Sequence, residues 1–419
     1  MSDTLSTKQG IIDQDWLSEV GDIRSFMDED YSVPLGRNNM YNVSLGRGNS
    51  QLAWARIGIE KWNMRVIPKI VSSGDAVEYN NAVLARLIPY IRKACKDAVT
   101  FGNSTVIIDR DNDNIRVSTP ENSFAKIDAF GTVIFTEDLG DICNISCSTA
   151  DDGSDSAIIC MQKGMEPVKT NIHTYTIFYG DDGSHPCGSS RLTNSVRSSI
   201  RAASRNKIRA EIASNFYTYP QRVINGAWEE MDRSILSGAK TMASGTTSIQ
   251  VLPKDPITGD KLDYTQFSSA DFTPFITLQE QLATEVATAL GINLTELGVV
   301  KSGDASNADS VYASHEAISV AIEAWEQEIA PVVQDIVDEY TKMKGIPSAY
   351  IAWREPAQPS KASAADAAIK LVSAFPTLAD NISVLRWAGL PDDVLSSIKS
   401  DLDPVIIQPD ANDDEGGNR

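Results

Sequence analysis

Histidine and the common catalytic motifs are scarce in this chain of 419 residues. Three histidines, His173, His185 and His315, stand in unrelated contexts. The HExxH pattern of zinc proteases and the GxSxG pattern of α/β-hydrolases are missing. A GxxxxGK[ST] phosphate loop is missing too, which excludes a P-loop nucleotide site. A hydrolase with scattered Ser, His and Asp residues stays open as an alternative.

Cysteines and long apolar runs are also few. An odd number of cysteines, with at most one loosely spaced pair, favours reduced thiols in a cytosolic setting over a disulfide framework. There are five: Cys95, Cys143, Cys147, Cys160 and Cys187. No stretch reaches about 18 consecutive apolar residues, so we expect no membrane span.

One acidic stretch resembles a calcium loop. Asp109, Asp111 and Asp113 match its first three ligand positions, but the sixth position is Asn114 instead of Gly and the twelfth is Pro120. A polar hairpin between two strands explains these residues without an ion. We therefore predict no metal ion, no cofactor and no enzymatic activity.

Charge of one sign is missing from two long segments. The chain has 37 basic and 57 acidic residues, a formal net charge of −20. Between Ser302 and Thr341 no Lys or Arg occurs, and this segment repels other polyanions. Its nine carboxylates are Asp304, Asp309, Glu316, Glu323, Glu326, Glu328, Asp335, Asp338 and Glu339.

The second one-signed segment is basic. Residues 191–209 contain six Lys and Arg and no acid. Four of the arginines recur every four residues along one gently spiralling helix face, namely Arg197, Arg201, Arg205 and Arg209. Because arginine pairs well with carboxylates, a solvated or subunit-bridging face is favoured over direct phosphate contact.

The alternation of patterns predicts an α+β chain. Residues 11–100 are mostly helical in pattern, and Gly102 ends the last of these helices. Short β-branched runs between 104 and 180 predict a small sheet of hairpins. A second helical block begins near 191 and ends at Pro220, and residues 222–268 have the pattern of turns and short strands.

Two further helices follow. The first starts after Ser269 or Asp271 and ends at Gly291, with an expected apolar stripe of Phe275, Leu278, Leu282, Val286 and Ala289. The second contains apolar residues at spacings of three and four up to Tyr340, and Pro331 inside it predicts a kink. Short helices over 361–400 and a disordered acidic tail complete the chain.

Several short motifs then occur in a fixed order between residues 185 and 345. They are "SR", "YPQRVING", "LP", "FSSADFTPF", "ALGINLTELG" and "SNAD", followed by the long helix. In order and spacing they resemble the central part of the portal proteins of tailed bacteriophages. The resemblance implies a portal-type subunit with an α/β wing, stem helices, a small β-containing clip, a long kinked tunnel helix and a helical crown.

On this resemblance the chain divides into six parts. They are a wing over 1–190, a stem helix over 191–218, a clip over 219–268, a second stem helix over 269–295, a tunnel loop and long helix over 296–344, and a crown with an acidic tail over 345–419.

The resemblance also implies a setting and partners. Twelve copies would form a ring at one capsid vertex of a virion assembled in the cytoplasm of a bacterial host. Double-stranded DNA would pass through the ring without sequence specificity during packaging and ejection. The implied partners are the major capsid protein, the terminase large subunit and a head-tail adaptor, with no membrane involved. Another head or adaptor structural protein is the main alternative.

Three groups of residues become site candidates. Arg197, Arg201, Arg205 and Arg209 would form an inter-subunit basic stripe. Asp309, Glu316 and Glu323 would belong to an acidic channel helix. The tunnel loop facing DNA would contain Lys301, Ser302, Gly303, Asp304, Ala305 and Ser306. A helix with acids and no cations beside this loop, whose only cation is Lys301, would let DNA slide, because each cation that neutralises a phosphate favours binding.

Overall fold

The computed structural model describes part of the chain. The described residues are 14–34, 50–72, 77–128, 133–138, 144–148, 158–161, 168–170, 172–181, 184–218, 222–225, 263–266, 271–299, 308–354, 356, 366, 370 and 373. The chain divides into two units, Met1–Pro356 and Ala357–Arg419. In the second unit Lys370 and Asp366, one helical turn apart, form an ion pair of 2.6 Å. The remaining description concerns the first unit.

Four helices lie before Gly102, with the strand β1 (Pro68–Ser72) between the second and the third: α1 (Gln14–Met27), α2 (Trp54–Asn63), α3 (Val77–Leu84) and α4 (Ile88–Phe101). Helix α4 has Pro89 in its first turn, where the missing N–H costs nothing. Gly102 ends it with φ 107°, as predicted. The helical pattern upstream is divided between α3 and α4, because Pro89 has no N–H to donate to the carbonyl of Ala85, one turn earlier, and its ring clashes with that carbonyl.

The region of short strands forms two antiparallel sheets where the sequence predicted one. In the smaller sheet β2 (Asn103–Asp109) lies between β3 (Asn114–Val117) and β9 (Ile172–Phe178). The larger follows chain order: β4 (Ser123–Ile127), β5 (Val133–Asp138), β6 (Asn144–Ser148), β7 (Ile158–Met161) and β8 (Val168–Thr170). Because β9 pairs with β2, the last strand of the region 103–178 lies beside the first.

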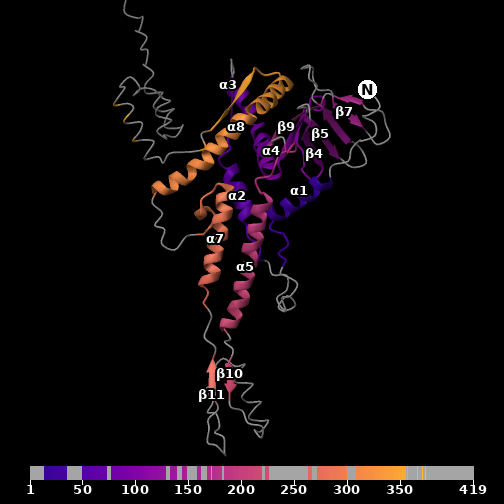
Figure 1. Cartoon of the computed structure of the whole chain (residues 1–419). Helices are drawn as coiled ribbons and strands as arrows, with labels where there is room; N and C mark the ends of the chain where they lie inside the picture. The colour runs from indigo at the N-terminus through magenta and orange to yellow at the C-terminus, as the bar shows by residue number, and fades with distance from the viewer. Residues whose placement is uncertain are drawn as a thin grey trace, which may run out of the picture. The chain divides into compact units, whose positions relative to one another are not determined.

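Two helices pack along each other, α5 (Asn194–Thr218) and α7 (Thr273–Leu290) (Figure 1). Between them in the sequence, β10 (Arg222–Asn225) pairs with β11 (Asp263–Gln266) as an antiparallel hairpin. Gly291 ends α7 in the left-handed conformation, as predicted. The helices and short strands expected between 191 and 291 are therefore present.

The predicted apolar stripe of α7 is partly wrong. Val286 is buried, but Leu278 is 39% exposed and Ala289 also lies at the surface. The buried face consists of Ala283, Val286, Ala287 and Leu290. Packing against α2 determines which face of α7 is buried, because the small side chains of Ala283 and Ala287 allow the two helices to approach each other. The approach is close at Gly58 of α2, where an added Cβ would stand 2.4 Å from Leu290 Cδ1.

Helix α8 (Ala308–Lys344) is the longest in the described part of the chain, and only its backbone is described over its first ten residues. It continues through Pro331, so the predicted kink stays a prediction. Gln327 and Pro331 are both exposed, so water can reach the carbonyl that Pro331 leaves without a donor. After α8, β12 (Ala349–Trp353) pairs with β1 (Pro68–Ser72).

One large hydrophobic core connects these elements. It takes side chains from α1, α2, α4, β2, α5, α7 and α8. Two tryptophans fix the sheets to the helices: Trp16 of α1 donates to the Ser123 carbonyl at 3.1 Å, and Trp325 of α8 donates to the Phe178 carbonyl at 3.0 Å. Within the described residues, no helix has the length and apolar character needed to cross a bilayer.

Candidate functional site

The acidic helix α8 exposes fewer charges than its sequence suggests. Among its described side chains Glu323, Glu328 and Asp335 are exposed, and Asp338 is half-buried. Two other acids are turned inward, with 3% of their surface exposed. These are Glu326 and Glu339. Part of the negative charge therefore belongs to the interior of the protein.

Glu339 holds α8 against the smaller sheet. Both of its carboxylate oxygens accept hydrogen bonds from the guanidinium of Arg110, with Nη2 at 2.7 Å from Oε2. His173 of β9 places its Nε2 3.7 Å from the same carboxylate. Burial, together with the charge of Glu339, raises the pKa of Tyr175 above its usual range. Glu339 is thus a structural charge, already paired within the chain.

Glu326 is the second inward acid, and its Oε1 has no hydrogen-bond partner among the described residues. Burial, with a smaller contribution from the negative charge of Glu323, raises the pKa of Glu326 to about 7. At neutral pH this carboxyl is therefore about half protonated. Cys95 of α4 is fully buried, and its thiol pKa is raised by desolvation and by Glu326.

The predicted tunnel loop lies outside the described residues. This applies to Lys301, Ser302, Gly303, Asp304, Ala305 and Ser306. Of the acidic channel residues, Asp309 and Glu316 lie on the described backbone of α8, and their side chains are not described. Glu323 is exposed on the same helix.

The chain that enters this loop is fixed in place by a short 3₁₀ helix, η1 (Leu294–Leu297). Asn293 and Glu296 form a capping box across it, and Leu297 is buried. Glu296 also pairs with Lys61 in the last turn of α2 at 3.9 Å and with Arg65, just after that helix, at 3.2 Å. The Asn-x-x-Glu spacing is a signal that could have revealed this anchor from the sequence.

Arg191 joins several elements at the end of α7. Its Nη2 donates to the Leu290 carbonyl at 2.7 Å, and its Nη1 to the Tyr179 hydroxyl at 2.5 Å. Its guanidinium lies 3.8 Å from the centre of the Trp62 ring. Tyr179 in turn meets Trp325 of α8 edge to face, with centroids 5.6 Å apart. Sequence reasoning counted Arg191 only as one charge of the basic segment.

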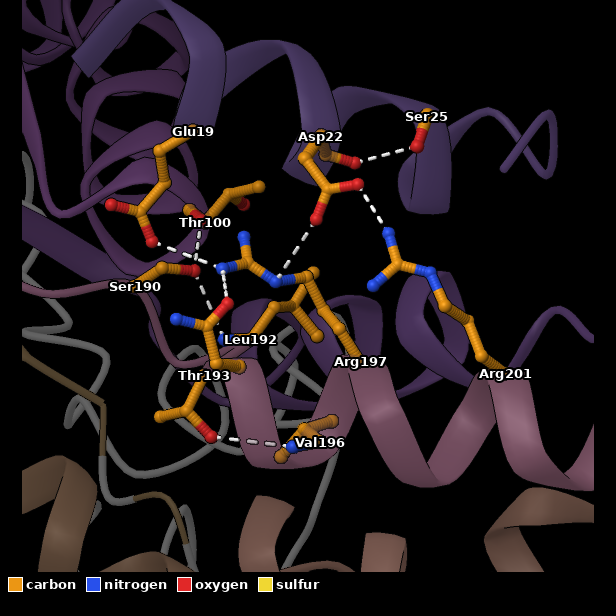
Figure 2. A network of polar contacts seen from close by, with 11 residues as sticks. Glu19, Asp22, Ser25, Thr100, Ser190, Leu192, Thr193, Val196, Arg197 and Arg201 are labelled. Carbon is orange, nitrogen blue, oxygen red and sulfur yellow. Dashed lines mark hydrogen bonds and ion pairs between the residues drawn. The ribbon is translucent and has the colours of Figure 1, made fainter. Parts of the chain in front are cut away.

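The basic stripe is bound within the chain at its beginning. Figure 2 shows Arg197 between two acids of α1, with Nη2 3.0 Å from Glu19 Oε1 and Nε 3.4 Å from Asp22 Oδ2. Arg201 binds the other oxygen of Asp22 and stacks over Phe26 at 4.6 Å. Arg197 and Arg201 thus pair with acids of their own chain, and the predicted contact of the stripe with a neighbouring subunit stays a prediction.

The end of the stripe is different. Each step of four residues advances about 40° around a helix, so the four arginines turn gradually outward. Arg197 is 2% exposed, Arg205 is half-buried and Arg209 is exposed. Among the described residues neither Arg205 nor Arg209 has an acidic partner. These two remain candidates for a contact between subunits.

The calcium-like stretch is a turn between β2 and β3. The carboxylate of Asp109 accepts from the backbone N–H groups of Asp111 at 3.1 Å and Asn112 at 3.2 Å. Asp113 has φ 50° and pairs with Lys344 at 2.6 Å. The predicted hairpin is confirmed. In the described part of the chain no group of three or more His, Cys, Asp or Glu side chains could hold a metal ion.

Comparison with known proteins gives a match in structure. A chain in the neck of an empty gene transfer agent particle, computed with C6 symmetry, has a TM-score of 0.51 and 13% sequence identity. The match covers 89% of this chain and 99% of that one. The chain has the fold of a gene transfer agent neck protein. No protein-family model and no curated protein sequence matches.

Two other structures of such particles score lower. A chain of the native gene transfer agent virion has a TM-score of 0.47 at 13% identity, with 89% of this chain and 98% of that chain covered. A chain in the native neck, computed with C12 symmetry, has a TM-score of 0.44 at 12% identity, with 89% and 99% covered. The neck-protein fold is consistent with the predicted α+β class and accounts for nearly the whole length of the first match.

Proposed function

We propose that this chain is a portal subunit of a phage-type particle, which forms a ring around the path of double-stranded DNA. The observation that carries the proposal is the neck-protein fold, which covers 89% of the chain. The order of elements supports it: a helix pair, α5 and α7, is separated by a β hairpin and followed by the long helix α8.

The parts of the portal then fall on these elements. The wing is 1–190, the stem helices 191–218 and 269–295 contain α5 and α7, and the clip 219–268 contains the β10–β11 hairpin. The segment 296–344 supplies the tunnel loop and α8, and 345–419 the crown. In this role the ring meets the major capsid protein, the terminase large subunit and a head-tail adaptor at one vertex of the virion.

Charge explains how a conduit of this kind works. Each copy has a formal net charge of −20, and DNA is itself a dense polyanion. In the segment 301–306 the only cation is Lys301, and the described surface of α8 adds Glu323, Glu328 and Asp335. Each phosphate neutralised by a cation would favour binding through counterion release. An anionic lining does not gain binding free energy from counterion release, so DNA slides through the ring without being held.

Negative-stain images of the purified protein test the proposal. We expect toroids with a central hole in the end-on view. A small oligomer without an axial hole would instead favour the alternative of another head or adaptor protein. Turnover in a screen of generic hydrolase substrates would overturn the non-enzymatic role.

A second test addresses the lining. Asp304→Lys with Asp309→Lys should slow a reconstituted packaging reaction or leave DNA held in the ring. The matched control is Asp111→Lys with Glu211→Lys, which changes the net charge equally at two exposed positions of the β2–β3 turn and α5. Unchanged packaging by the first variant would contradict a repulsive lining.

A further inference from the structure

The helix pair α5 and α7 has outward faces of opposite charge. Beyond its contacts with α1, α5 carries three cations, Arg205, Lys207 and Arg209, and one acid, Glu211. Helix α7 contains Glu280 and Glu285 and no Lys or Arg. Opposite charges on two helices of one subunit can either pair within that subunit or connect one copy to the next.

Contacts inside the subunit define the facing sides of the two helices. Asn206 Nδ2 of α5 donates to the Phe275 carbonyl at 2.8 Å and to Gln279 Oε1 at 3.0 Å. Arg205 and Arg209 are turned about 100° and about 60° away from Asn206 around α5. Arg205 is therefore turned off the side of α5 that meets α7, and Arg209 lies at the edge of that side, in the same direction, and is exposed.

Glu280, which is half-buried, is turned off the side of α7 that meets α5 in a similar manner. It follows Gln279 directly, which places it about 100° around α7 from the side that meets α5. Ile276 precedes Glu280 by one turn and is 57% exposed. Glu285 differs, because Oε2 accepts a hydrogen bond from Ser199 of the same chain at 3.3 Å.

An exposed isoleucine beside an acid is a suitable surface for an arginine. The aliphatic stem of arginine can cover apolar side chains while its guanidinium reaches a carboxylate. Among the described residues Arg205 and Arg209 have no acidic partner, and none is described for Glu280. The two surfaces of one chain are complementary in charge, and they face different directions.

Building on the proposed ring, we propose that Ile276 and Glu280 of α7 receive Arg205 and Arg209 of α5 from a second copy of the chain. The contact joins two different surfaces, so each copy keeps one of each surface free for the next neighbour. A head-to-tail contact of this type generates a ring when its rotation closes. Arg197 and Arg201 hold α1 in each subunit, and Arg205 and Arg209 connect the subunits.

Charge reversal tests the pairing. Arg205→Glu places a negative charge opposite Glu280 in every contact, and Glu280→Arg places a positive charge opposite Arg205. We expect each variant alone to lose assembly, with an apparent affinity between subunits at least about tenfold weaker. The double variant R205E/E280R should assemble again. The readouts are native mass spectrometry and analytical ultracentrifugation, with circular dichroism to show that each variant is folded.

Mixing separates pairing between copies from pairing inside a copy. Arg205→Glu and Glu280→Arg chains, mixed in equal amounts, have complementary surfaces and should form oligomers in which the two alternate. Each chain in the mixture still carries like charges at positions 205 and 280, so mixing cannot restore a pair within one copy. Failure of the mixture to assemble, while the single variants are folded, would overturn the inference, whether or not the double variant assembles.

Glu285→Arg is the matched control, with the same charge change on the same helix. It should leave assembly close to wild type, because Glu285 already bonds to Ser199. Normal assembly of the single variants would overturn this inference and leave the ring intact. Absence of rings in the wild type would instead overturn the proposed function.

Discussion

Burial of individual acids decides how much of the charge of α8 reaches its surface. Glu339 pairs with Arg110, and Glu326 lies in the core without a hydrogen-bond partner for Oε1 among the described residues. A buried carboxylate without a cation is costly, so the protonated form is favoured. The exposed charge of α8 is therefore lower than the count of its carboxylates.

The raised pKa of Glu326 predicts how the stability of the protein changes with pH. Since it is raised from the usual value of 4.5 to about 7, the folded protein binds this proton more tightly than the unfolded chain. The group thus lowers stability as pH rises from about 5 to about 8, by roughly 3 kcal/mol at the upper end. Glu326→Gln should remove this loss and be more stable than wild type at pH 8.

Urea unfolding at pH 5 and pH 8 measures the effect. Wild type and Glu326→Gln should be similar at pH 5 and separate at pH 8. The control is Glu211→Gln, which removes an exposed acid and should stay within about 0.5 kcal/mol of wild type at both values. Equal stability of Glu326→Gln and wild type at pH 8 would show that Glu326 titrates normally.

At the scale of elements, arginines fix the helices to one another. Arg191 satisfies the last carbonyl of α7 and stacks on Trp62 of α2, while its partner Tyr179 meets Trp325 of α8. Arg197 and Arg201 attach α1 to α5 through Asp22. The positions of the helices around the core thus depend on a few paired charges as well as on apolar packing.

Two ion pairs connect α8 to the β2–β3 hairpin, and we expect them to contribute different amounts to the free energy of unfolding. Arg110–Glu339 has a carboxylate that is 4% exposed, whereas the acid of Lys344–Asp113 is 63% exposed. Glu339→Gln leaves Arg110 without its buried partner and should cost about 3 kcal/mol. Lys344→Gln should cost less than about 1 kcal/mol. Thermal unfolding of the two variants compares them, and equal losses would contradict this ranking.

At the scale of the whole molecule, net charge bears on the proposed passage of DNA. A protein of charge −20 per copy has little to gain from counterion release on duplex DNA. Purified wild-type protein should therefore retain no duplex in a filter-binding assay at about 0.15 M salt. The Asp304→Lys and Asp309→Lys variant should retain DNA, and this binding should weaken as salt increases. Tight, salt-sensitive retention by the wild type would contradict the sliding mechanism.

The sequence by itself determined the order and type of most elements. Periods of 3.6 and 2, with Gly102 and Gly291 as stops, predicted α4, the strands, α5, α7 and α8, because these signals act within one turn or one strand. The polar turn at Asp109–Asp113 was equally local. The comparison with a gene transfer agent neck chain supports a phage-type fold, and the portal role that the resemblance implied stays a proposal.

Tertiary structure alone decided which side chains of each pattern are buried. Leu278 and Glu326 belong to regular helical patterns, yet Leu278 is exposed and Glu326 is buried, since the neighbouring helix determines the face that packs. The division of the arginine stripe between α1 and the surface has the same origin. Pairs such as Arg110–Glu339 join residues 229 positions apart, and local spacing carries no signal for contacts of that range.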